Sequence, residues 1–459
     1  MAQNRLFPSA HLLGREHWFL LTVLGVAAFF EGYDTFIVTA ALPQIRETFD
    51  LSRTAASAWL AIPILGAVPA VWFSRRADTH GRKRVLWLSI VGFTLLTGAT
   101  AFAPSMAAFV SLQFCAQLFL VVEGAIAWTM VAEEFPAGAR GFGFGWLAML
   151  TAIGSGMSSI LYGGVFEPNN ISWRGLYLVA LPPLAAIMFF RRRLPESRRF
   201  MAAEASGRLA ESWRHILAPP HKRWILLVCL VAFVMALTTQ AGVFVIDFLQ
   251  EDRDMSATVA NFMVVGAGAL AVPVLVIAGG VSDRYGRKVV GCSFGLLSVL
   301  GGAAFFVFAR GAVALFISLM LTFAGQFGAW PTLGAFGSEL FPTAHRALAG
   351  AWSNVARVAG QSSSYLIAAL LLRITADNQS ITAVILGVGP FIGVILIWLM
   401  FPETKGRELE EISGDVPFAV VTPPPLEAGA LGLGSILEER EIETPQDQAS
   451  PSEAGTTEG

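Results

Sequence analysis

The sequence predicts an all-α integral membrane protein with twelve transmembrane helices in two related halves. Three observations predict this fold class: the composition, the number of long apolar segments, and two short motifs that each occur twice. Of the 459 residues, 55% are hydrophobic and 14% are charged, whereas a soluble domain usually carries about 25% charged residues. The chain is therefore too apolar for a soluble protein of this length.

Apolar segments of about 20 residues, the length that crosses the hydrocarbon core of a bilayer as a helix, occur twelve times. Many contain Gly or Pro, which membrane helices tolerate because neighbouring helices satisfy the freed backbone groups. The expected spans are 17–42, 54–74, 85–103, 107–132, 140–165, 173–193, 223–249, 257–280, 289–309, 311–338, 346–372 and 379–401.

The loops between the spans alternate between basic and nearly neutral or acidic. Basic loops stay in the cytoplasm, so we expect both termini there and a multi-pass protein of the inner (plasma) membrane. The expected parts are a cytoplasmic N-terminus (1–16), an N-terminal six-helix bundle (17–193), a cytoplasmic central loop (194–222), a C-terminal six-helix bundle (223–401) and a cytoplasmic, largely disordered acidic tail (402–459).

Two motifs recur in the two halves. The loop ADTHGRK (77–83) follows the second span and SDRYGRK (282–288) follows the eighth, while EEFP (133–136) recurs as ELFP (339–342). Two independent motifs at nearly the same offset indicate a duplicated six-span unit.

These duplicated loops and the six-plus-six layout resemble the major facilitator superfamily of secondary transporters along residues 15–410. The stretches PESRRF (195–200) and PETKGR (402–407) are similar to signatures of its sugar porters and related metabolite symporters. EGYD (31–34) resembles the D-G-x-D motif of aromatic-acid:proton symporters, with Glu31 in place of the first Asp. The resemblance implies two pseudo-symmetric six-helix bundles around a central cavity that work by alternating access.

The first span contains the stretch FFEGYDTF (29–36), which places two acids in the middle of an apolar run. Glu31 and Asp34 are three residues apart, hence on one face of a helix. Ionised carboxylates at the bilayer centre are costly, so these acids are expected to face a water-filled cavity, pair with a cation or stay protonated. Proton coupling needs such groups, and a structural pair bonded to backbone or a neighbouring helix is the alternative.

Glu123 in the fourth span is a third acid near mid-membrane, and Arg357 in the eleventh span lies too deep to reach the interface easily. Glu123 either joins Glu31 and Asp34 in an acidic cavity or balances an intramembrane Arg. Arg357 could bind a carboxylate substrate through two parallel hydrogen bonds. The alternatives for Arg357 are an internal ion pair and snorkelling to the interface.

Other polar and aromatic residues inside the spans could contact a solute. Asp247, near the outer end of the seventh span, is expected to be a solvated rim residue. Amide side chains could orient a solute or bond between helices, and tryptophans could form an aromatic wall or ordinary core. These candidates are Gln240, Gln326, Asn354, Trp128 and Trp330.

The duplicated loops have a mechanical interpretation as a clasp that holds the cytoplasmic side shut. An Asp at a helix end can face the positive N-terminus of a neighbouring helix, and the basic pair can bridge to acids of the second repeated motif. A topology signal alone is the alternative. The residues assigned to the clasp are Asp78, Gly81, Arg82, Lys83, Asp283, Arg284, Gly286, Arg287, Lys288, Glu133, Arg140, Glu339 and Arg346.

The sequence has no Walker-type phosphate-binding loop and no metal-ligand or nucleophile constellation. We therefore expect a transporter and not an enzyme, without cofactors, driven by the proton gradient and functional as a monomer in the lipid bilayer, with no nucleic-acid partner. The first hypothesis is proton-coupled symport of a small organic or aromatic acid. The alternatives are a sugar or polyol:proton symporter, a drug or metabolite:proton antiporter, and a transporter-like sensor that does not transport.

Overall fold

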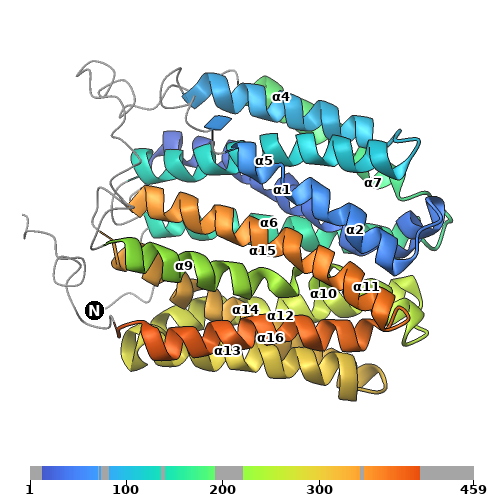
Figure 1. Ribbon diagram of the computed structural model, residues 1–459. Helices are drawn as coiled ribbons and strands as arrows, with labels where there is room; N and C mark the ends of the chain where they lie inside the picture. Colours follow the sequence, from blue (N-terminus) through green and yellow to red (C-terminus); the bar gives the residue numbers. More distant parts are fainter. Residues whose placement is uncertain are drawn as a thin grey trace, which may run out of the picture. The chain divides into compact units, whose positions relative to one another are not determined.

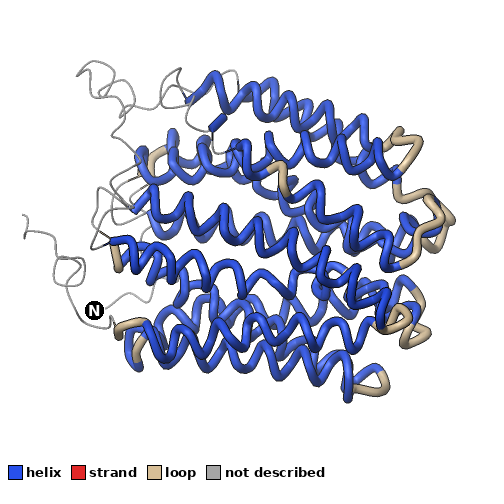
Figure 2. Tube along the Cα trace, in the orientation of Figure 1, coloured by secondary structure: helices blue, strands red, loops and turns tan. Residues whose placement is uncertain are grey.

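A computed structural model of the chain describes residues 13–403, apart from residues 71, 74–81, 136–139, 192–220 and 342–345. The part of the chain so described is helical and contains no strand (Figure 2). Most of the expected central loop and nearly all of the expected tail lie outside it. The all-α fold class expected from the sequence is confirmed.

The helices of the first half run alongside one another in Figure 1, and each expected span of this half falls on one of them. Gly163 and its neighbours form a π-helical turn, η3, that extends the fifth of these helices. The bounds are α1 (Arg15–Thr48), α2 (Arg53–Ile64), α4 (Arg82–Thr100), α5 (Met106–Glu134), α6 (Arg140–Leu161), η3 (Tyr162–Phe166) and α7 (Arg174–Arg191).

The second half has the same character, but its first span is broken into short pieces. Its bounds are α9 (His221–Met235), η5 (Ala236–Thr238), α10 (Thr239–Val243), α11 (Val245–Glu251), α12 (Ala257–Tyr285), α13 (Arg287–Ala303), η6 (Ala304–Phe308), α14 (Ala312–Glu339), α15 (Arg346–Ile374) and α16 (Gln379–Met400). The division into two six-helix bundles stays a prediction, since helices of the two halves also pack on each other, as α15 does on α2.

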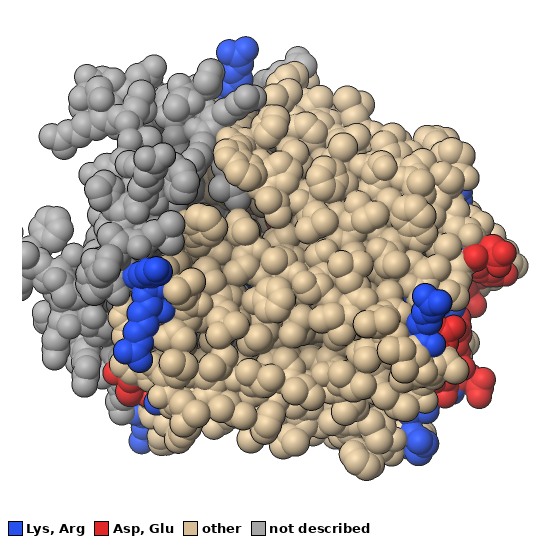
Figure 3. All heavy atoms as spheres, viewed as in Figure 1, with Lys and Arg blue, Asp and Glu red and all other residues tan. Residues whose placement is uncertain are grey.

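In the described residues, nine helical runs are long and apolar enough to cross a membrane. The expected second, third and sixth spans fall on α2, α4 and α7, which are shorter or less apolar. Figure 3 shows charged side chains at the two ends of the helices and an uncharged band between them on the face in view. This distribution is that of a protein whose middle lies in hydrocarbon.

Two glycines bring α1 and α6 into backbone contact. A Cβ atom on Gly154 would lie 1.9 Å from the carbonyl oxygen of Phe29, and the Ser155 hydroxyl donates a hydrogen bond to the carbonyl of Gly32 at 3.1 Å. Small residues allow this approach between membrane helices. The packing of α1 on α6 therefore fixes the segment that carries Glu31 and Asp34.

The break in the seventh span is stabilised by a neighbouring helix. A 3-10 turn at Ala236–Thr238 separates α9 from α10, and a non-helical residue, Phe244, separates α10 from α11. Unwound backbone inside a membrane needs partners from neighbouring elements. Ser364 of α15 supplies them, because its hydroxyl donates to the carbonyl of Leu237 at 2.5 Å and accepts from the backbone N–H of Gln240 at 3.1 Å.

Candidate functional site

Glu31 of α1 faces α5. A Cβ atom on Gly124 would lie 3.5 Å from Glu31 Oε1, so the carboxylate of Glu31 rests against the backbone of α5 beside Glu123. Glu123 is buried, and Glu31 is half-buried. The structure thus brings two of the three membrane acids together.

Asp34 occupies a different environment, although it is only three residues from Glu31. Its side chain is buried, and Thr97 of α4 donates a hydrogen bond to Asp34 Oδ1 at 3.4 Å. Tyr177 of α7 is an electrostatic neighbour of Asp34, and its buried hydroxyl has no hydrogen-bond partner within the described part of the chain. Asp34 therefore points into the packing of α1, α4 and α7, while Glu31 points to α5.

Arg357 of α15 is half-buried and bonds to a neutral group. Its Nη2 donates to Asn354 Oδ1 at 2.7 Å, one turn away on the same helix. The ion pairs found among the described residues do not include Arg357. The internal ion pair considered as one alternative for Arg357 is therefore not seen in this part of the structure.

The face of α15 that carries Arg357 points at the broken seventh span. Arg357 and Ser364 are seven residues apart, which is two helical turns or about 10 Å along one face. Ser364 bonds to the backbone at Leu237 and Gln240, as described above. Arg357 thus lies two helical turns along α15 from a polar cluster centred on Gln240.

The polar side chains of that cluster bond to one another. Gln240 and Gln379 exchange side-chain hydrogen bonds of 3.3 and 3.2 Å, and Gln240 Nε2 also donates to the Ser57 hydroxyl at 3.2 Å. All three side chains are fully buried. Because Ser57 belongs to α2 and the two glutamines to α10 and α16, the cluster joins the two halves of the chain.

An ion-pair network lies beyond this cluster, at the end where α1 ends and α2 begins. Asp247 of α11 binds two arginines: Oδ1 accepts from Arg46 Nη1, and Oδ2 accepts from Arg53 Nε at 2.7 Å. Arg46 also pairs with Glu251 at 2.7 Å, and Arg53 pairs with Asp252. We call these five residues the arginine–acid network.

The interpretation of Asp247 as a solvated rim residue is therefore wrong. Its side chain is 0% exposed, and both of its oxygens are held by guanidinium groups from the first half. Position near the end of a span indicated a solvent-facing acid, but the packing of α11 against α1 covers it.

One acid that the sequence interpretation did not assign holds the second repeated loop. Glu403 accepts hydrogen bonds from the backbone N–H groups of Arg287 at 2.9 Å and Lys288 at 3.1 Å. Gly286, at φ +109°, leaves room for it, since a Cβ there would lie 2.7 Å from Glu403 Oε2. Glu403 thus caps the N-terminus of α13, the arrangement that a helix end favours for an anion.

The remaining candidates are exposed or half-buried, or their side chains lie outside the described part of the chain. Gln326 of α14 and Arg284 are exposed, and Lys83 is half-buried. The side chains outside the described part of the chain are those of Trp128, Trp330, Asp78, Arg82, Asp283, Glu133, Arg140, Glu339 and Arg346, together with Gly81.

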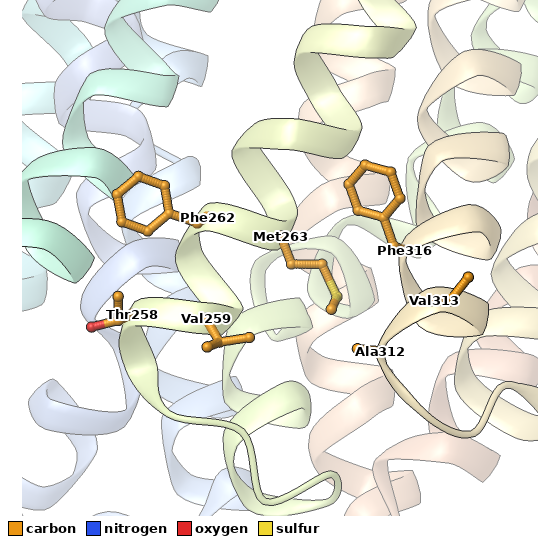
Figure 4. A pocket seen from close by; sticks show the side chains of 7 residues that line it. All are labelled: Thr258, Val259, Phe262, Met263, Ala312, Val313 and Phe316. Atoms are coloured by element: carbon orange, nitrogen blue, oxygen red, sulfur yellow. The ribbon is translucent and has the colours of Figure 1, made fainter.

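An apolar groove of about 500 Å³ lies between α12 and α14 (Figure 4). Phe262 and Val313 on its wall are exposed, which suits contact with lipid. It contains no charged residue and is not a site for an anionic solute. The lining residues are Thr258, Val259, Phe262, Met263, Ala312, Val313 and Phe316.

Sequence reasoning missed the buried Tyr177 beside Asp34. It also missed five polar residues that join distant segments: Arg46, Arg53, Ser57, Gln379 and Glu403. Arg53 offered one signal, since an arginine at the start of the second apolar span needs a partner. Pairing between distant helices gave no such signal for the glutamines and serines.

The fold and these sites define a polytopic helical transporter, with buried polar groups along the interface of the two halves. The sequence pattern of the Major Facilitator Superfamily matches residues 24–364, and the chain belongs to that superfamily. It is a transporter of small organic solutes and not an enzyme.

Similar proteins agree with this assignment. The niacin transporter NiaP of Acinetobacter baylyi is 25% identical over 87% of this chain and 97% of its own length. The gallate transporter of Pseudomonas putida is 25% identical over 73% of this chain and 81% of its own length. The fold is similar to that of the xylose transporter XylE from E. coli in an inward-open conformation, with a TM-score of 0.69 at 18% identity over 86% of this chain and 98% of that one.

Proposed function

We propose that the chain is a proton-coupled symporter of a small organic acid, with an aromatic carboxylate as the preferred solute. The observation that carries this proposal is Arg357, a half-buried membrane arginine whose side chain bonds to the neutral Asn354. A guanidinium in this setting can hold a carboxylate through two parallel charge-assisted hydrogen bonds. Asn354 would orient the guanidinium and leave its other donors for the solute.

Glu31, Asp34 and Glu123 are the proposed proton carriers. An ionised acid at the middle of a membrane helix costs about 2.5–3.5 kcal/mol on insertion scales. Proton coupling needs acids that take up and release a proton as water reaches them from one side or the other, and acids inside membrane helices are the candidates for that role. The separate surroundings of Asp34 and of the Glu31–Glu123 pair support two proton sites.

Energy and placement follow from the same proposal. The transporter would need no cofactor, since the proton gradient supplies the energy, and would work as a monomer in the inner membrane. Both termini would lie in the cytoplasm, which puts the arginine–acid network at the outer side. The bonds of Glu403 to α13 would then belong to the cytoplasmic clasp.

The relatives support an aromatic acid, because niacin and gallate are both aromatic carboxylates. A sugar or polyol:proton symporter is the second candidate. The buried amides of Gln240 and Gln379 favour it, since amides bind hydroxyl groups in both directions. In the structure, however, these amides bond to each other and to Ser57.

Uptake into proteoliposomes with an imposed proton gradient tests the proposal. The panel would contain benzoate, nicotinate, gallate, xylose and a cationic dye. We expect accumulation of the carboxylates, loss of accumulation in Arg357→Gln, and loss of gradient dependence in Asp34→Asn. Arg373→Gln is the matched control, because Arg373 is exposed in the last turn of the same helix.

Three outcomes would contradict the proposal. Uptake of xylose alone would favour the sugar porter, and proton-driven extrusion of the dye would favour an antiporter. Carboxylate uptake that is equal in Arg357→Gln and Arg373→Gln would show that Arg357 does not bind the solute.

A further inference from the structure

Two arginines share one carboxylate in the arginine–acid network. Arg46 reaches Oδ1 of Asp247, and Arg53 reaches Oδ2 at 2.7 Å. Asp247 is 0% exposed, and Arg53 is 6% exposed. A carboxylate enclosed between two guanidiniums is the arrangement by which proteins bind carboxylate ligands.

The charges are divided between the halves. Both arginines belong to the first half, on α1 and α2, and the three acids that pair with them follow one another on and after α11 in the second half. If the halves separate at this end, the acids leave together and the arginines stay behind. The two guanidiniums then face water side by side without an acid between them, and an anion that enters is attracted to both.

We propose that Arg46 and Arg53 form a carboxylate-binding site at this end of the protein. Asp247 occupies the site while the end is closed, and a solute carboxylate takes its place when the end opens. The solute class rests on the proposed function, but the binding chemistry rests on the arginines alone.

The site leads toward the interior. Ser57 lies one turn after Arg53 on α2, is fully buried, and bonds to Gln240. Separation of the halves would expose Ser57 together with the arginines. A carboxylate leaving Arg53 would then pass Ser57 and Gln240, which belong to the polar cluster two turns from Arg357.

A cysteine at position 57 can report on both opening and occupancy. Ser57→Cys is placed in a chain whose Cys115, Cys229 and Cys292 are replaced by Ser, and its reaction with a charged methanethiosulfonate is timed in detergent micelles, where both ends are accessible. We expect Asp247→Asn to speed the reaction about tenfold or more, equivalent to about 1.4 kcal/mol in the closing equilibrium.

Benzoate is the probe of occupancy. In the Asp247→Asn variant, benzoate should slow the reaction several-fold, because its carboxylate replaces the missing one, and the neutral benzamide should not. The effect of benzoate should disappear when Arg46→Gln and Arg53→Gln are added. Asp377→Asn is the control acid at the same end. Its carboxylate accepts from Thr54 and only its backbone carbonyl accepts from Arg53; Asn keeps both acceptors, so the rate should stay unchanged.

Two results would overturn the proposal. One is an unchanged rate in Asp247→Asn, and the other is equal protection by benzoate with and without the two arginines. If Asp247→Asn does not purify as a monodisperse protein, Arg53→Gln replaces it in the test. The proposal then requires that Ser57→Cys reacts faster in Arg53→Gln and that benzoate does not slow this reaction. The assay needs no proton gradient, so failure of carboxylate uptake with intact benzoate protection would refute the proposed function and leave this site standing.

Discussion

Gly32 of α1 lies directly against Thr151 of α6: a Cβ atom on Gly32 would lie 1.9 Å from the carbonyl oxygen of Thr151. Gly32 stands between Glu31 and Asp34 in the chain. The contact therefore fixes the position of both acids along and around α1. Glu31 then points toward α5, and Asp34 points toward α4 and α7.

Replacing Gly32 should displace both acids. Gly32→Ala forces α1 away from α6, and we expect a loss of about 1–3 kcal/mol in stability, as for overpacking elsewhere, together with a fall in proton-driven uptake. Thermal unfolding in detergent and proteoliposome uptake measure the two effects. Gly387→Ala in α16 is the control, since a Cβ there has nothing within 4 Å; equal behaviour of the two variants would refute the role of this contact.

How far the sequence predicts this structure depends on whether the signal is local. Hydropathy predicts the helices because each span must satisfy its own backbone hydrogen bonds in the bilayer. Every expected span falls on helical segments, and the seventh is divided among several. The location of Glu31, Asp34 and Arg357 in the middle of long helices was predictable for the same reason. The partners of these residues were not, because hydropathy along one span contains no information about which helix packs beside it.

The contrast between Asp34 and Asp247 illustrates that limit. Three-residue spacing predicts one face for Glu31 and Asp34, yet their side chains reach different helices. Position in the span predicts a solvated Asp247, yet α1 and α2 supply two arginines that bury it. Both differences arise from tertiary packing of segments distant in sequence.

The cap that Glu403 provides should contribute to stability. Glu403→Gln removes the charge and can keep at most one of the two acceptors for the N–H groups of Arg287 and Lys288. We expect a loss of about 0.5–2 kcal/mol, as for other helix N-terminal caps. The measurement is the unfolding temperature, with Glu47→Gln, an exposed acid of α1, as the control. An unfolding temperature equal to that of the control would contradict the cap.

Tyr177 offers a test of the surroundings of Asp34. Its buried hydroxyl has no hydrogen-bond partner among the described residues. Removing it should not destabilise the protein, since an unsatisfied buried group costs about 1–3 kcal/mol. We expect Tyr177→Phe to unfold at an equal or higher temperature and to lower proton-driven uptake, because the hydroxyl is a donor close to Asp34.

Tyr33→Phe is the matched variant for Tyr177→Phe. The Tyr33 hydroxyl donates to the carbonyl of Leu176 at 3.0 Å, so its removal should cost about 0.5–1.5 kcal/mol of stability. If both variants lose the same stability, the Tyr177 hydroxyl has a partner after all. If Tyr177→Phe transports normally, the hydroxyl does not serve Asp34.

The reciprocal bonds between Gln240 and Gln379 should appear as coupling in a double-mutant cycle. Either single change to Leu leaves the other amide buried with fewer partners, at a cost of about 1–3 kcal/mol. In the double variant both amides are gone, so we expect a smaller loss than the sum of the singles, with a coupling energy of about 0.5–3 kcal/mol. Unfolding in detergent of the four proteins measures it.

Pairing Gln379→Leu with Gln113→Leu is the control, since Gln113 bonds to Thr100 in the first half and shares no partner with Gln379; that pair should be additive. Additivity of Gln240→Leu and Gln379→Leu would mean that the two amides do not depend on each other, and the cluster would then owe its order to Ser57 and Ser364 alone.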